Sequence, residues 1–301
     1  MRNDIIYTIV VTYNSMRWVE KCISSLVNSS QPTEIIVVDN ASTDGTVEYI
    51  RENYPFVQLI EAGENLGFAK ANNIGIRYAL NHGADYVFLL NHDAWVEKET
   101  LSSLIDCMQI HGKVGIVSPI HLTGDKSQLD PKFSLFMPDK FHEDIDKRKQ
   151  QIIYEIDFVN AAAWLMNVKM IHQIGGFDTM LFVHYGEDRN FCQRVHYFGW
   201  KIYVDTRTTI CHDRFERVSN RDYRENIFQQ THAILEYKSK FGNINIRYNI
   251  LRLMAKEALF GIGQVALLRF SKANKHIKRI PILYNINKSR KINKIGGLVW
   301  L

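Results

Sequence analysis

Long uncharged hydrophobic runs are missing from this 301-residue sequence, so a simple membrane-spanning helix is not expected. No stretch reaches the roughly 18 apolar residues that such a helix requires. The first residues, MRNDIIYTIVVTYN, include the acid Asp4 and only a short apolar run. This start is therefore a poor match to a secretory signal peptide.

Cysteine is scarce, and the four cysteines lie far apart without forming a CxxC pair: Cys22, Cys107, Cys192 and Cys211. This spacing argues against a disulfide framework or a zinc site and favours a reducing compartment, the cytoplasm. The patterns GxGxxG, GxxxxGK[ST], GxSxG and HExxH are also absent. Rossmann dinucleotide binding, P-loop hydrolysis and the common hydrolase mechanisms are therefore poorly supported.

The charge is unevenly placed along the chain. Residues 247–301 hold 12 Lys and Arg and the single acid Glu257, whereas the other 246 residues hold 25 basic and 31 acidic residues. A mildly acidic body with a basic tail is unlike a uniformly basic nucleic-acid binder, so no nucleic acid is expected as a partner. Residues 250–294 combine apolar and basic side chains, which favours contact with an anionic membrane surface. The alternatives are a helix packed on the body with a solvated basic face, or self-association.

Apolar β-branched runs alternate with helix-like segments through the first 118 residues. Strands are expected at 5–12, 35–38, 57–61, 86–90 and 114–118, and helices at 16–28, 46–53, 68–82 and 98–112. This order predicts an α/β fold with a mostly parallel, doubly wound central sheet flanked by helices. Ligands of such sheets bind outside the carboxyl ends of the strands.

The rest of the chain is less regular. Residues 121–157 contain Pro131, Pro138 and a charged stretch, so we expect a long insertion there. Residues 158–168 resume as a strand or helix. A helix is expected from Glu187 to Phe198, a strand at 201–204, a helix at 223–241, and then the basic, helical C-terminal extension.

Polar side chains follow three of the expected strands. They are Thr12–Asn14, Asp39 with Asn40, and Asn91–Asp93. Polar residues often follow strands simply because loops are exposed to solvent, which easily explains one such strand end. Three strand ends that each carry side chains suited to a nucleotide or a metal favour a binding site. Asp93 offers carboxylate oxygens to a hard divalent cation, and His212, after a later strand, can complete an Mn²⁺ or Mg²⁺ site.

Glu187 and Asp188 form an acidic pair at the start of a helix, where carboxylates are favoured in any case. The functional interpretation is a general base that deprotonates an acceptor hydroxyl. Neighbouring helix positions point about 100° apart, so one of the two faces the reactants. Arg194 follows on the same helix and can brace Glu187 or bind an acceptor.

Six segments, taken in order, resemble the family 2 glycosyltransferases, which have the GT-A fold. The segments are TIVVTYNS (8–15), EIIVVDNASTDGT (34–46), ENLGFAKANNIGI (64–76), FLLNHDAW (88–95), GGFDTMLFVHYGEDRNFCQRV (175–195) and CHDRF (211–215). They span about residues 5–217. The resemblance is to the bacterial rhamnosyltransferase-like branch, which builds surface polysaccharides.

The resemblance implies a role for each matching residue. It assigns donor binding to Thr12, Tyr13, Asn14, Asp39, Asn65, Gly67, Asn73 and Asn91, metal binding to Asp93 and His212, catalysis to Asp188 with Glu187 beside it, and acceptor binding to Arg194 and Trp164. Asp39 would contact the nucleotide base. Uracil and thymine present the same imide N–H, so UDP- and dTDP-sugars both stay open.

One departure from the family pattern stands out. The first acid of the Asp-x-Asp metal motif is Asn91 here, and the middle residue is His92. This removes one negative charge near the metal and leaves the choice between Mn²⁺ and Mg²⁺ open. The implied reaction is a single inverting displacement that moves a sugar to a saccharide acceptor, possibly lipid-linked, at the cytoplasmic face of the plasma membrane.

The resemblance also divides the chain into three parts. Residues 1–120 form the nucleotide-sugar half, 121–222 the acceptor and catalytic half, and 223–301 the basic extension. A nucleotidyltransferase is one alternative, but it needs a glycine-rich basic loop where TYNSMRW stands. A non-catalytic nucleotide- or carbohydrate-binding scaffold is the other alternative, and only Asn91 favours it.

Overall fold

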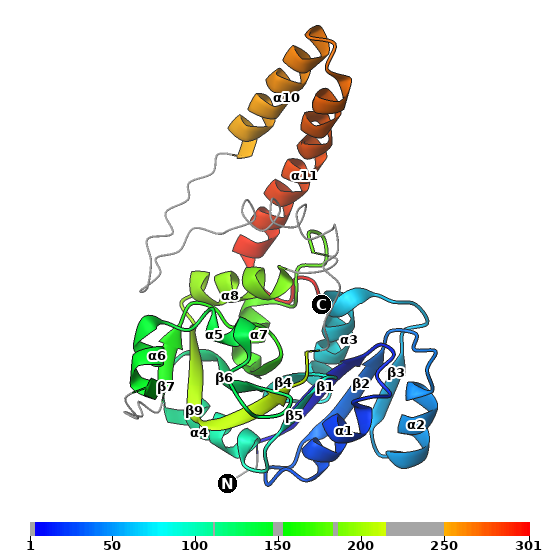
Figure 1. The fold of residues 1–301 in the computed structure, drawn as a ribbon, viewed down its shortest axis with the longest axis vertical. Coiled ribbons are helices and arrows are strands. Elements are labelled where there is room, and N and C mark those ends of the chain that lie inside the picture. Colours follow the sequence, from blue (N-terminus) through cyan, green and yellow to red (C-terminus); the bar gives the residue numbers. More distant parts are fainter. Residues whose placement is uncertain (1–3, 111, 147–152, 183–185, 215–249) are drawn as a thin grey trace.

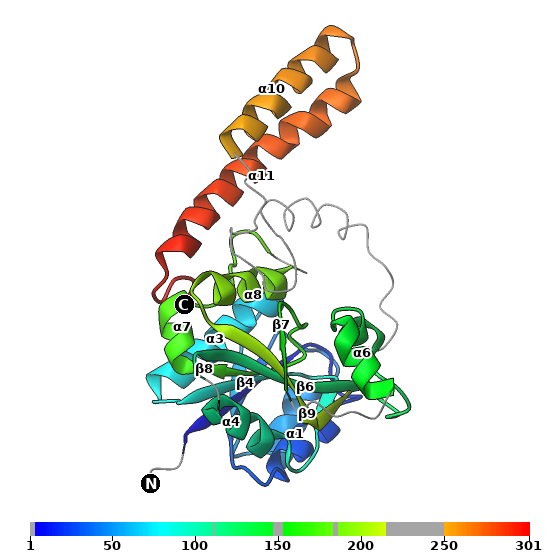
Figure 2. The same ribbon diagram turned by 90° about the vertical axis from the view of Figure 1, so that its left-hand side faces the viewer.

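The computed structural model describes residues 4–110, 112–146, 153–182, 186–214 and 250–301. It shows a helix-flanked sheet from which a helical hairpin projects (Figures 1 and 2). The strands are β1 (Ile6–Thr12), β2 (Glu34–Asp39), β3 (Gln58–Glu61), β4 (Tyr86–Asn91), β5 (Ala94–Val96), β6 (Val114–Thr123), β7 (Ile153–Ile156), β8 (Ala163–Asn167) and β9 (Lys201–His212). The helices are α1 (Val19–Val27), α2 (Thr46–Asn53), α3 (Gly67–Asn81), α4 (Thr100–Ile110), α5 (Pro131–Ser134), α6 (Asp139–Asp146), α7 (Val168–Ile174), α8 (Glu187–Tyr197), α10 (Ile250–Ala266) and α11 (Phe270–Ile295).

The first half of the sheet is parallel, as the alternating pattern predicts. Strand β1 pairs with β2 on one side and β4 on the other, and β3 extends the sheet beyond β2. Successive side chains of a strand point to opposite faces. Ile9 accordingly packs in the core on the α3 face, and Val10 packs in the core on the α1 and α4 face. Burial on both faces explains the continuous apolar run in β1.

The second half of the sheet is mixed and adds antiparallel strands to the parallel pairs. Strand β8 lies between β4 and β6 and runs antiparallel to both. Strand β9 is parallel to β6 and antiparallel to β5 and β7. The order along the described sheet is β3-β2-β1-β4-β8-β6-β9-β5, with β7 on β9. A buried apolar run carries no signal for strand direction, which depends on the connection before it.

The segment 121–157, expected to be an insertion, contributes regular structure. Strand β6 continues to Thr123, and α5, α6 and β7 follow among its described residues. Pro131 is the first residue of α5 rather than a helix breaker, because the missing N–H is harmless at this position. The side chain of Asp130 caps the same helix by accepting hydrogen bonds from the N–H groups of Lys132 and Phe133.

The C-terminal hairpin, defined here as α10 and α11, extends away from the sheet beyond α8 (Figures 1 and 2). Glu257 on α10 ties the two helices together through His276 and Arg279 on α11. The helix expected at residues 223–241 lies outside the described residues. Among the residues that the structure describes, no helix is both long enough and apolar enough to cross a membrane.

The base of the hairpin is fixed to the body by a buried polar cluster. Asp178 accepts hydrogen bonds from Ser289 and Asn293 of α11, and all three residues are buried. Leu181 and Phe182 pack against Leu283 and Ile286 of the same helix. This contact lies a few residues before α8.

The last residues of the chain return to the body. The N–H of Gly176 donates to the carbonyl of Val299 at 2.9 Å. Gly175 has a φ of +80°, and a Cβ at this position would lie 2.1 Å from the Val299 carbonyl oxygen. Only glycine fits here, which explains the Gly-Gly pair of the GGFD segment.

Candidate functional site

The carboxyl ends of β1, β2 and β4 meet at one edge of the sheet. The pairing register places Thr12 beside Asp39 and Val11 beside Asn91. The Thr12 hydroxyl donates to Asp39 at 2.7 Å, and the N–H and hydroxyl of Ser42 donate at 2.8 and 2.5 Å. A carboxylate has about four acceptor positions, so Asp39 is held rigidly and keeps one position for a ligand donor.

The loop after β1 forms the exposed side of this edge. Asn14 has a φ of 50°, a left-handed conformation that asparagine tolerates well. Its N–H donates to Ser42 Oγ at 2.9 Å, and its side-chain oxygen accepts from the N–H of Thr43 at 2.8 Å. Tyr13 is 48% exposed. The loop is therefore ordered but accessible, as a binding surface requires.

The turn before α3 carries two of the expected donor residues. Asn65 is exposed, and its side-chain oxygen accepts from the N–H of Gly67 at 3.0 Å. Gly67 has a φ of +75° where the helix begins. Gly67 itself is buried, and the turn lies at the N-terminal end of a helix, where backbone N–H groups can face a phosphate.

Asn73, which is expected to bind the donor, does not lie in this surface. Its side chain is 3% exposed. Its amide nitrogen donates to the carbonyls of Phe177 and Trp300, and its oxygen accepts from the N–H of Phe177. Because these backbone groups occupy the buried amide, Asn73 links α3 to the GGFD segment and the end of the chain.

Asp93 and His212, the expected metal ligands, lie side by side. Strand β5 pairs with β9 so that Ala94 lies opposite His212, and Asp93 Oδ1 is 3.2 Å from His212 Nε2. Asn91 Nδ2 is 3.4 Å from the same nitrogen. Burial by itself would lower the pKa of His212, but the carboxylates of Asp130 and Asp93 outweigh burial and raise it.

The donor set fits an Mn²⁺ or Mg²⁺ ion that is shared with a ligand. Asp93 supplies a buried carboxylate and His212 a buried imidazole, which are donors that Mn²⁺ accepts. Within the described ranges, no cluster of three or more His, Cys, Asp and Glu side chains forms a complete metal site. The two residues therefore suit an ion whose remaining ligands come from a bound diphosphate or water.

Trp18, Asp130 and Asp213 were missed by the sequence reasoning. Trp18 packs edge-on against His92 of the Asn-His-Asp segment, and its indole N–H donates to Asp213 at 2.8 Å. Asp130 contacts His212 from the side opposite Asp93. An aspartate directly before a proline is typical of a helix N-cap, and this pattern could have identified Asp130. The contact of Asp130 with His212 depends on the fold and could not have been found from the sequence.

The acidic pair at the start of α8 separates into two environments. Gly186, with a φ of 103°, turns the chain into the helix. Glu187 is buried, and its Oε2 has no hydrogen-bond partner among the described residues. Asp188 is only partly buried and accepts from the N–H of Arg189 at 2.7 Å. Burial raises the pKa of both carboxyl groups, and for Glu187 the neighbouring charge of Asp188 adds to this effect.

The turn before β8 connects Asp188 to the sheet edge formed by the carboxyl ends of β1, β2 and β4. The backbone N–H of Ala161 lies near the Asp188 carboxylate and offsets part of the rise in its pKa. The next residue, Ala162, accepts from the N–H of Asn91 at 2.9 Å. The structure therefore connects the acidic pair to the end of β4, although the two are nearly a hundred positions apart in the sequence.

The structure places Arg194 and Trp164, the two residues expected to bind the acceptor, in the core rather than at the surface. Both side chains are fully buried. The Arg194 guanidinium donates to the carbonyls of Ile174 and Gly176, so it satisfies backbone groups behind the GGFD segment. Trp164 stacks on Phe177 in the core. A buried arginine that donates to backbone carbonyls in this way holds its surroundings in place.

The comparisons with known proteins agree with this architecture. The model of "Glycosyl transferase family 2" matches residues 7–175, which is more than half of the chain. The fold and the site define a GT-A glycosyltransferase. The chain belongs to glycosyl transferase family 2.

Two curated relatives are rhamnosyltransferases. The dTDP-rhamnosyl transferase RfbF of Shigella flexneri is 28% identical over 203 residues, which cover 67% of each chain. The N-acetylglucosaminyl-diphospho-decaprenol L-rhamnosyltransferase of Mycobacterium tuberculosis is 24% identical over 235 residues, covering 69% of this chain and 76% of the relative. The chain is therefore similar to the bacterial rhamnosyltransferase-like branch.

Solved structures share the fold at lower identity. Mannosyltransferase PcManGT of Pyrobaculum calidifontis, in complex with GDP-Man and Mn²⁺, superposes with a TM-score of 0.59 at 19% identity, over 96% of this chain and 86% of that chain. S. aureus TarS 1-349, in complex with UDP, gives a TM-score of 0.57 at 16% identity, over 96% and 89% of the two chains. These likenesses show the GT-A fold.

Proposed function

We propose that this chain moves a sugar from a nucleoside-diphosphate donor to a saccharide acceptor in one inverting, metal-dependent step. The observation that carries the proposal is the link from Asp188 through Ala161 and Ala162 to Asn91. It brings a partly exposed carboxylate to the strand edge that holds Asp39, Asp93 and His212. A base, a metal-binding pair and a nucleotide-binding edge then share one site.

The donor is a UDP- or dTDP-sugar. Asp39 keeps one acceptor position after its three hydrogen bonds, and the imide N–H of uracil or thymine is a matching donor. Thr12, Tyr13 and Asn14 line the same edge. The S. flexneri relative is named as a dTDP-rhamnosyl transferase, which supports a deoxyhexose donor.

Asp93 and His212 would hold the metal. Asn91 would lie beside the metal and contact the nucleotide-sugar donor. An Mn²⁺ or Mg²⁺ ion there supplies positive charge to the departing nucleoside diphosphate. The Mn²⁺ in the PcManGT complex supports this assignment. Replacing the first acid of the motif by Asn91 lowers the negative charge around the ion and makes the site depend more on the diphosphate.

Asp188 accepts the proton of the acceptor hydroxyl, and the freed oxygen attacks the anomeric carbon from the face opposite the leaving group. One displacement inverts the configuration and needs no nucleophilic carboxylate. Glu187 stays largely neutral because burial raises its pKa, so it can donate a hydrogen bond towards the site. The pair thus contributes one base rather than two like charges.

The acceptor is a saccharide on a lipid carrier. The M. tuberculosis relative is named for a diphospho-decaprenol acceptor, and this supports a lipid-linked saccharide as the acceptor. An acceptor of this kind is confined to a membrane, so an enzyme that uses it gains from a surface that binds lipid. We therefore propose that the protein works at the cytoplasmic membrane face in surface polysaccharide synthesis. Residues 1–120, 121–222 and 223–301 would serve as its donor, acceptor and membrane-associating parts.

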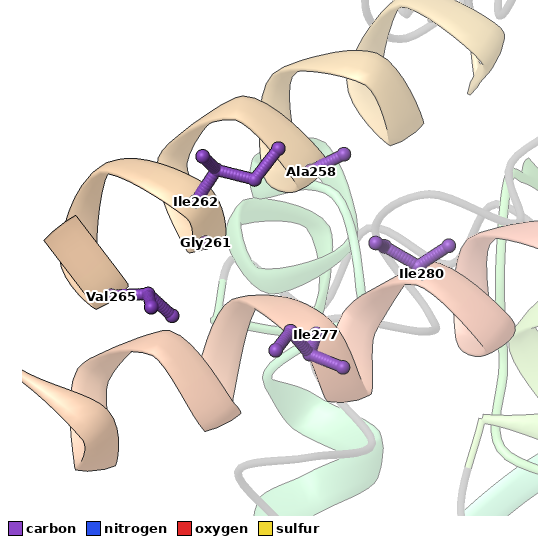
Figure 3. A pocket seen from close by; sticks show the side chains of 6 residues that line it. All are labelled: Ala258, Gly261, Ile262, Val265, Ile277 and Ile280. Atoms are coloured by element: carbon purple, nitrogen blue, oxygen red, sulfur yellow. The ribbon is translucent and has the colours of Figure 1, made fainter.

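The C-terminal hairpin provides that surface. Large apolar side chains are exposed along its far end: Leu259, Phe260, Ile262, Val265, Leu267, Leu268, Phe270 and Ile277. A groove between α10 and α11 is lined only by Ala258, Gly261, Ile262, Val265, Ile277 and Ile280, all carbon side chains (Figure 3). No acid occurs after Glu257, whereas basic residues continue to Lys294. Apolar side chains flanked by cations fit an anionic lipid surface.

The test is product analysis with UDP- and dTDP-sugars and saccharide acceptors on lipid carriers. The proposal expects a nucleoside diphosphate as the leaving product, a new glycoside of inverted anomeric configuration in the NMR spectrum, and loss of turnover with EDTA. Retention of configuration, or full turnover without a divalent ion, would contradict it. Release of pyrophosphate from a nucleoside triphosphate would point to a nucleotidyltransferase instead.

A further inference from the structure

The GGFD segment, residues 175–178, contacts both the helix that follows the donor turn and the helix that begins with the acidic pair. The ring of Phe177 lies edge-on to Phe68 of α3 at a centroid distance of 5.6 Å and next to Phe191 of α8 at 4.8 Å. Asn73 of α3 holds the backbone of the same residue: its side chain accepts from the Phe177 N–H at 2.7 Å and donates to the Phe177 carbonyl at 2.9 Å. The segment therefore fixes the position of α3 relative to α8.

Gly176 connects this segment to α8 on one side and to residues 296–301, named here the C-terminal segment, on the other. Its carbonyl accepts from the Arg194 guanidinium of α8, and its N–H donates to the Val299 carbonyl at 2.9 Å. The C-terminal segment follows α11 and lies against the body beside α8, where it is drawn in red (Figures 1 and 2). Leu301 packs against the core of the body.

Trp300 links the C-terminal segment to three other parts of the molecule. Its carbonyl accepts from Asn73 Nδ2 of α3 at 3.1 Å, and its indole N–H donates to Asn293 Oδ1 of α11 at 2.7 Å. Asn293 Nδ2 in turn donates to Asp178 Oδ2 of the GGFD segment at 3.0 Å. Asn293 and Asp178 are fully buried. The hydrogen bonds therefore run without a gap from α3 through Trp300 and α11 to the GGFD segment.

The backbone of Trp300 has a φ of 71°, in the left-handed region that a bulky residue rarely adopts. Such a conformation costs free energy and persists only where the surrounding contacts fix it. Glycine would suit this backbone better, but it could not donate a side-chain hydrogen bond to the buried Asn293. The indole N–H is therefore the feature that distinguishes tryptophan at this position.

We propose that Trp300 is a positioning residue for sugar transfer, which holds the donor turn before α3 and the acidic pair of α8 in register through the GGFD segment. The inference rests on the proposed function, because it presupposes a donor at Asn65 and Gly67 and a base at Asp188. It gives the base of the hairpin and the C-terminal segment a part in the reaction, in addition to the membrane contact proposed for the far end of the hairpin.

Transfer is sensitive to this register because the acceptor hydroxyl must meet the base and the anomeric carbon at the same time. A misplacement of about 1 Å, even from a change far from the reacting atoms, can cost roughly 100-fold in rate. Hydrolysis of the donor, in which water replaces the saccharide hydroxyl, needs no bound acceptor and is less sensitive. A residue that served stability alone would lower the melting temperature and leave the ratio of hydrolysis to transfer unchanged.

Two variants remove opposite ends of the same hydrogen bond. Trp300→Phe removes the indole N–H and keeps an aromatic ring and the carbonyl that Asn73 contacts. Asn293→Leu removes the acceptor with little change in side-chain volume. Trp200→Phe is the matched control, because Trp200 is also partly buried and its indole N–H donates at 2.7 Å to Gln173, which has no place in the proposed site.

The experiment uses the full chain and two readouts. The first is hydrogen–deuterium exchange of residues 175–178 without donor or metal, which reports whether the GGFD segment is held in place even when no turnover occurs. The second is the pair of initial rates for glycoside formation and donor hydrolysis, with a UDP- or dTDP-sugar, Mn²⁺ and a saccharide on a lipid carrier. Calorimetry with UDP and dTDP separates weaker donor binding from slower transfer.

We expect faster exchange at the N–H groups of Gly176 and Phe177 in Trp300→Phe and Asn293→Leu, and wild-type exchange in Trp200→Phe. Transfer should slow by about tenfold in the first two variants, hydrolysis should slow less, and the dissociation constants of UDP and dTDP should stay at the wild-type values. Unchanged exchange, or a wild-type ratio of hydrolysis to transfer in the folded variants, overturns the role of Trp300. A wild-type protein that transfers no sugar contradicts the proposed function instead, while the exchange readout still shows whether Trp300 holds the segment.

Discussion

The catalytic body and the C-terminal hairpin use opposite kinds of surface. In the body, most of the side chains proposed for the site are buried, and several polar groups are held by neighbours, as Asp39 is by Thr12 and Ser42. In the hairpin, large apolar side chains such as Leu268, which is 76% exposed, face outward among lysines and arginines. We propose that the two surfaces have different roles, with the reaction in the body and membrane contact in the hairpin.

The two parts are nevertheless joined by a buried contact. Asp178 receives hydrogen bonds from Ser289 and Asn293 at the base of the hairpin, and its other oxygen accepts from the N–H groups of Met180 and Leu181. These residues lead directly towards the acidic pair of α8. A hairpin bound to lipid would therefore hold the body, and the active site within it, in a fixed orientation.

The largest expected effect lies in the body. Asp188→Asn removes the proposed base while keeping its shape, so turnover should fall by about 10²- to 10⁴-fold. The measurement is the initial rate of glycoside formation, with melting temperature as the check on folding. Asp106→Asn, an exposed change on α4, is the matched control and should keep wild-type turnover. Full transfer by folded Asp188→Asn would contradict the assignment of the base.

A second change in the body tests the nucleotide edge. Asp39→Asn replaces the carboxylate that we expect to accept the base imide N–H. Loss of a hydrogen bond to a charged group weakens binding by about 10- to 100-fold. The measurement is the dissociation constant of UDP and dTDP by calorimetry in Mn²⁺. If both nucleotides bind Asp39→Asn as they bind the wild type, Asp39 does not recognise the base.

The hairpin is tested by a change that should leave the body untouched. Leu267→Glu combined with Leu268→Glu places charges at two exposed apolar positions. Each leucine that is buried in lipid contributes about 1.5 to 3 kcal/mol, so partitioning onto anionic vesicles should fall by more than tenfold. Sedimentation with vesicles measures this loss, and transfer to a short soluble acceptor should stay at the wild-type rate.

Leu135→Glu is the matched control for the hairpin variant. Leu135 belongs to the body and is 74% exposed, close to the exposure of Leu268. It should not change vesicle binding. Equal losses in both variants would mean that exposed leucines anywhere promote lipid binding, and the distinction between body and hairpin would then fail.

The smallest effect concerns stability. Burial raises the pKa of Glu187 above the ordinary value of 4.5. Folded protein then keeps a proton that unfolded protein releases, so the free energy of unfolding falls as pH rises from about 4.5 towards the folded-state pKa. Glu187→Gln cannot ionise, so its melting temperature should fall less between about pH 5 and pH 8. A profile parallel to that of the wild type, with Glu48→Gln as the exposed control, would contradict the buried-carboxyl account.

The sequence predicted the parallel half of the sheet well, because each of its strands is a compact β-branched run that ends in polar residues. It did not predict the direction of β8 or the presence of β5. Both depend on pairing with segments that are distant in the chain. Pro131 was interpreted as part of a long insertion, although proline is also favoured at the first position of a helix.

The candidate site shows a similar division. Asp39, Asp93, Asp188 and His212 lie in the places that their segments suggested, and their roles remain proposals. Asn73, Arg194 and Trp164 also lie in or near recognisable segments, but the fold uses the two polar ones to satisfy buried backbone groups and the third to fill the core. A sequence records which residue is polar, but not whether its partner is a ligand or the chain itself.

The most direct test of the central claim is a thermal-shift panel of UDP, dTDP, GDP and CDP, each with Mn²⁺, Mg²⁺ or EDTA. A ligand that binds only the folded protein raises its melting temperature. The account predicts a rise with UDP or dTDP that needs the divalent ion and is lost in EDTA. A rise with GDP or CDP alone would contradict the role of Asp39, and no rise with any nucleotide from well-folded protein would contradict the proposed donor site as a whole.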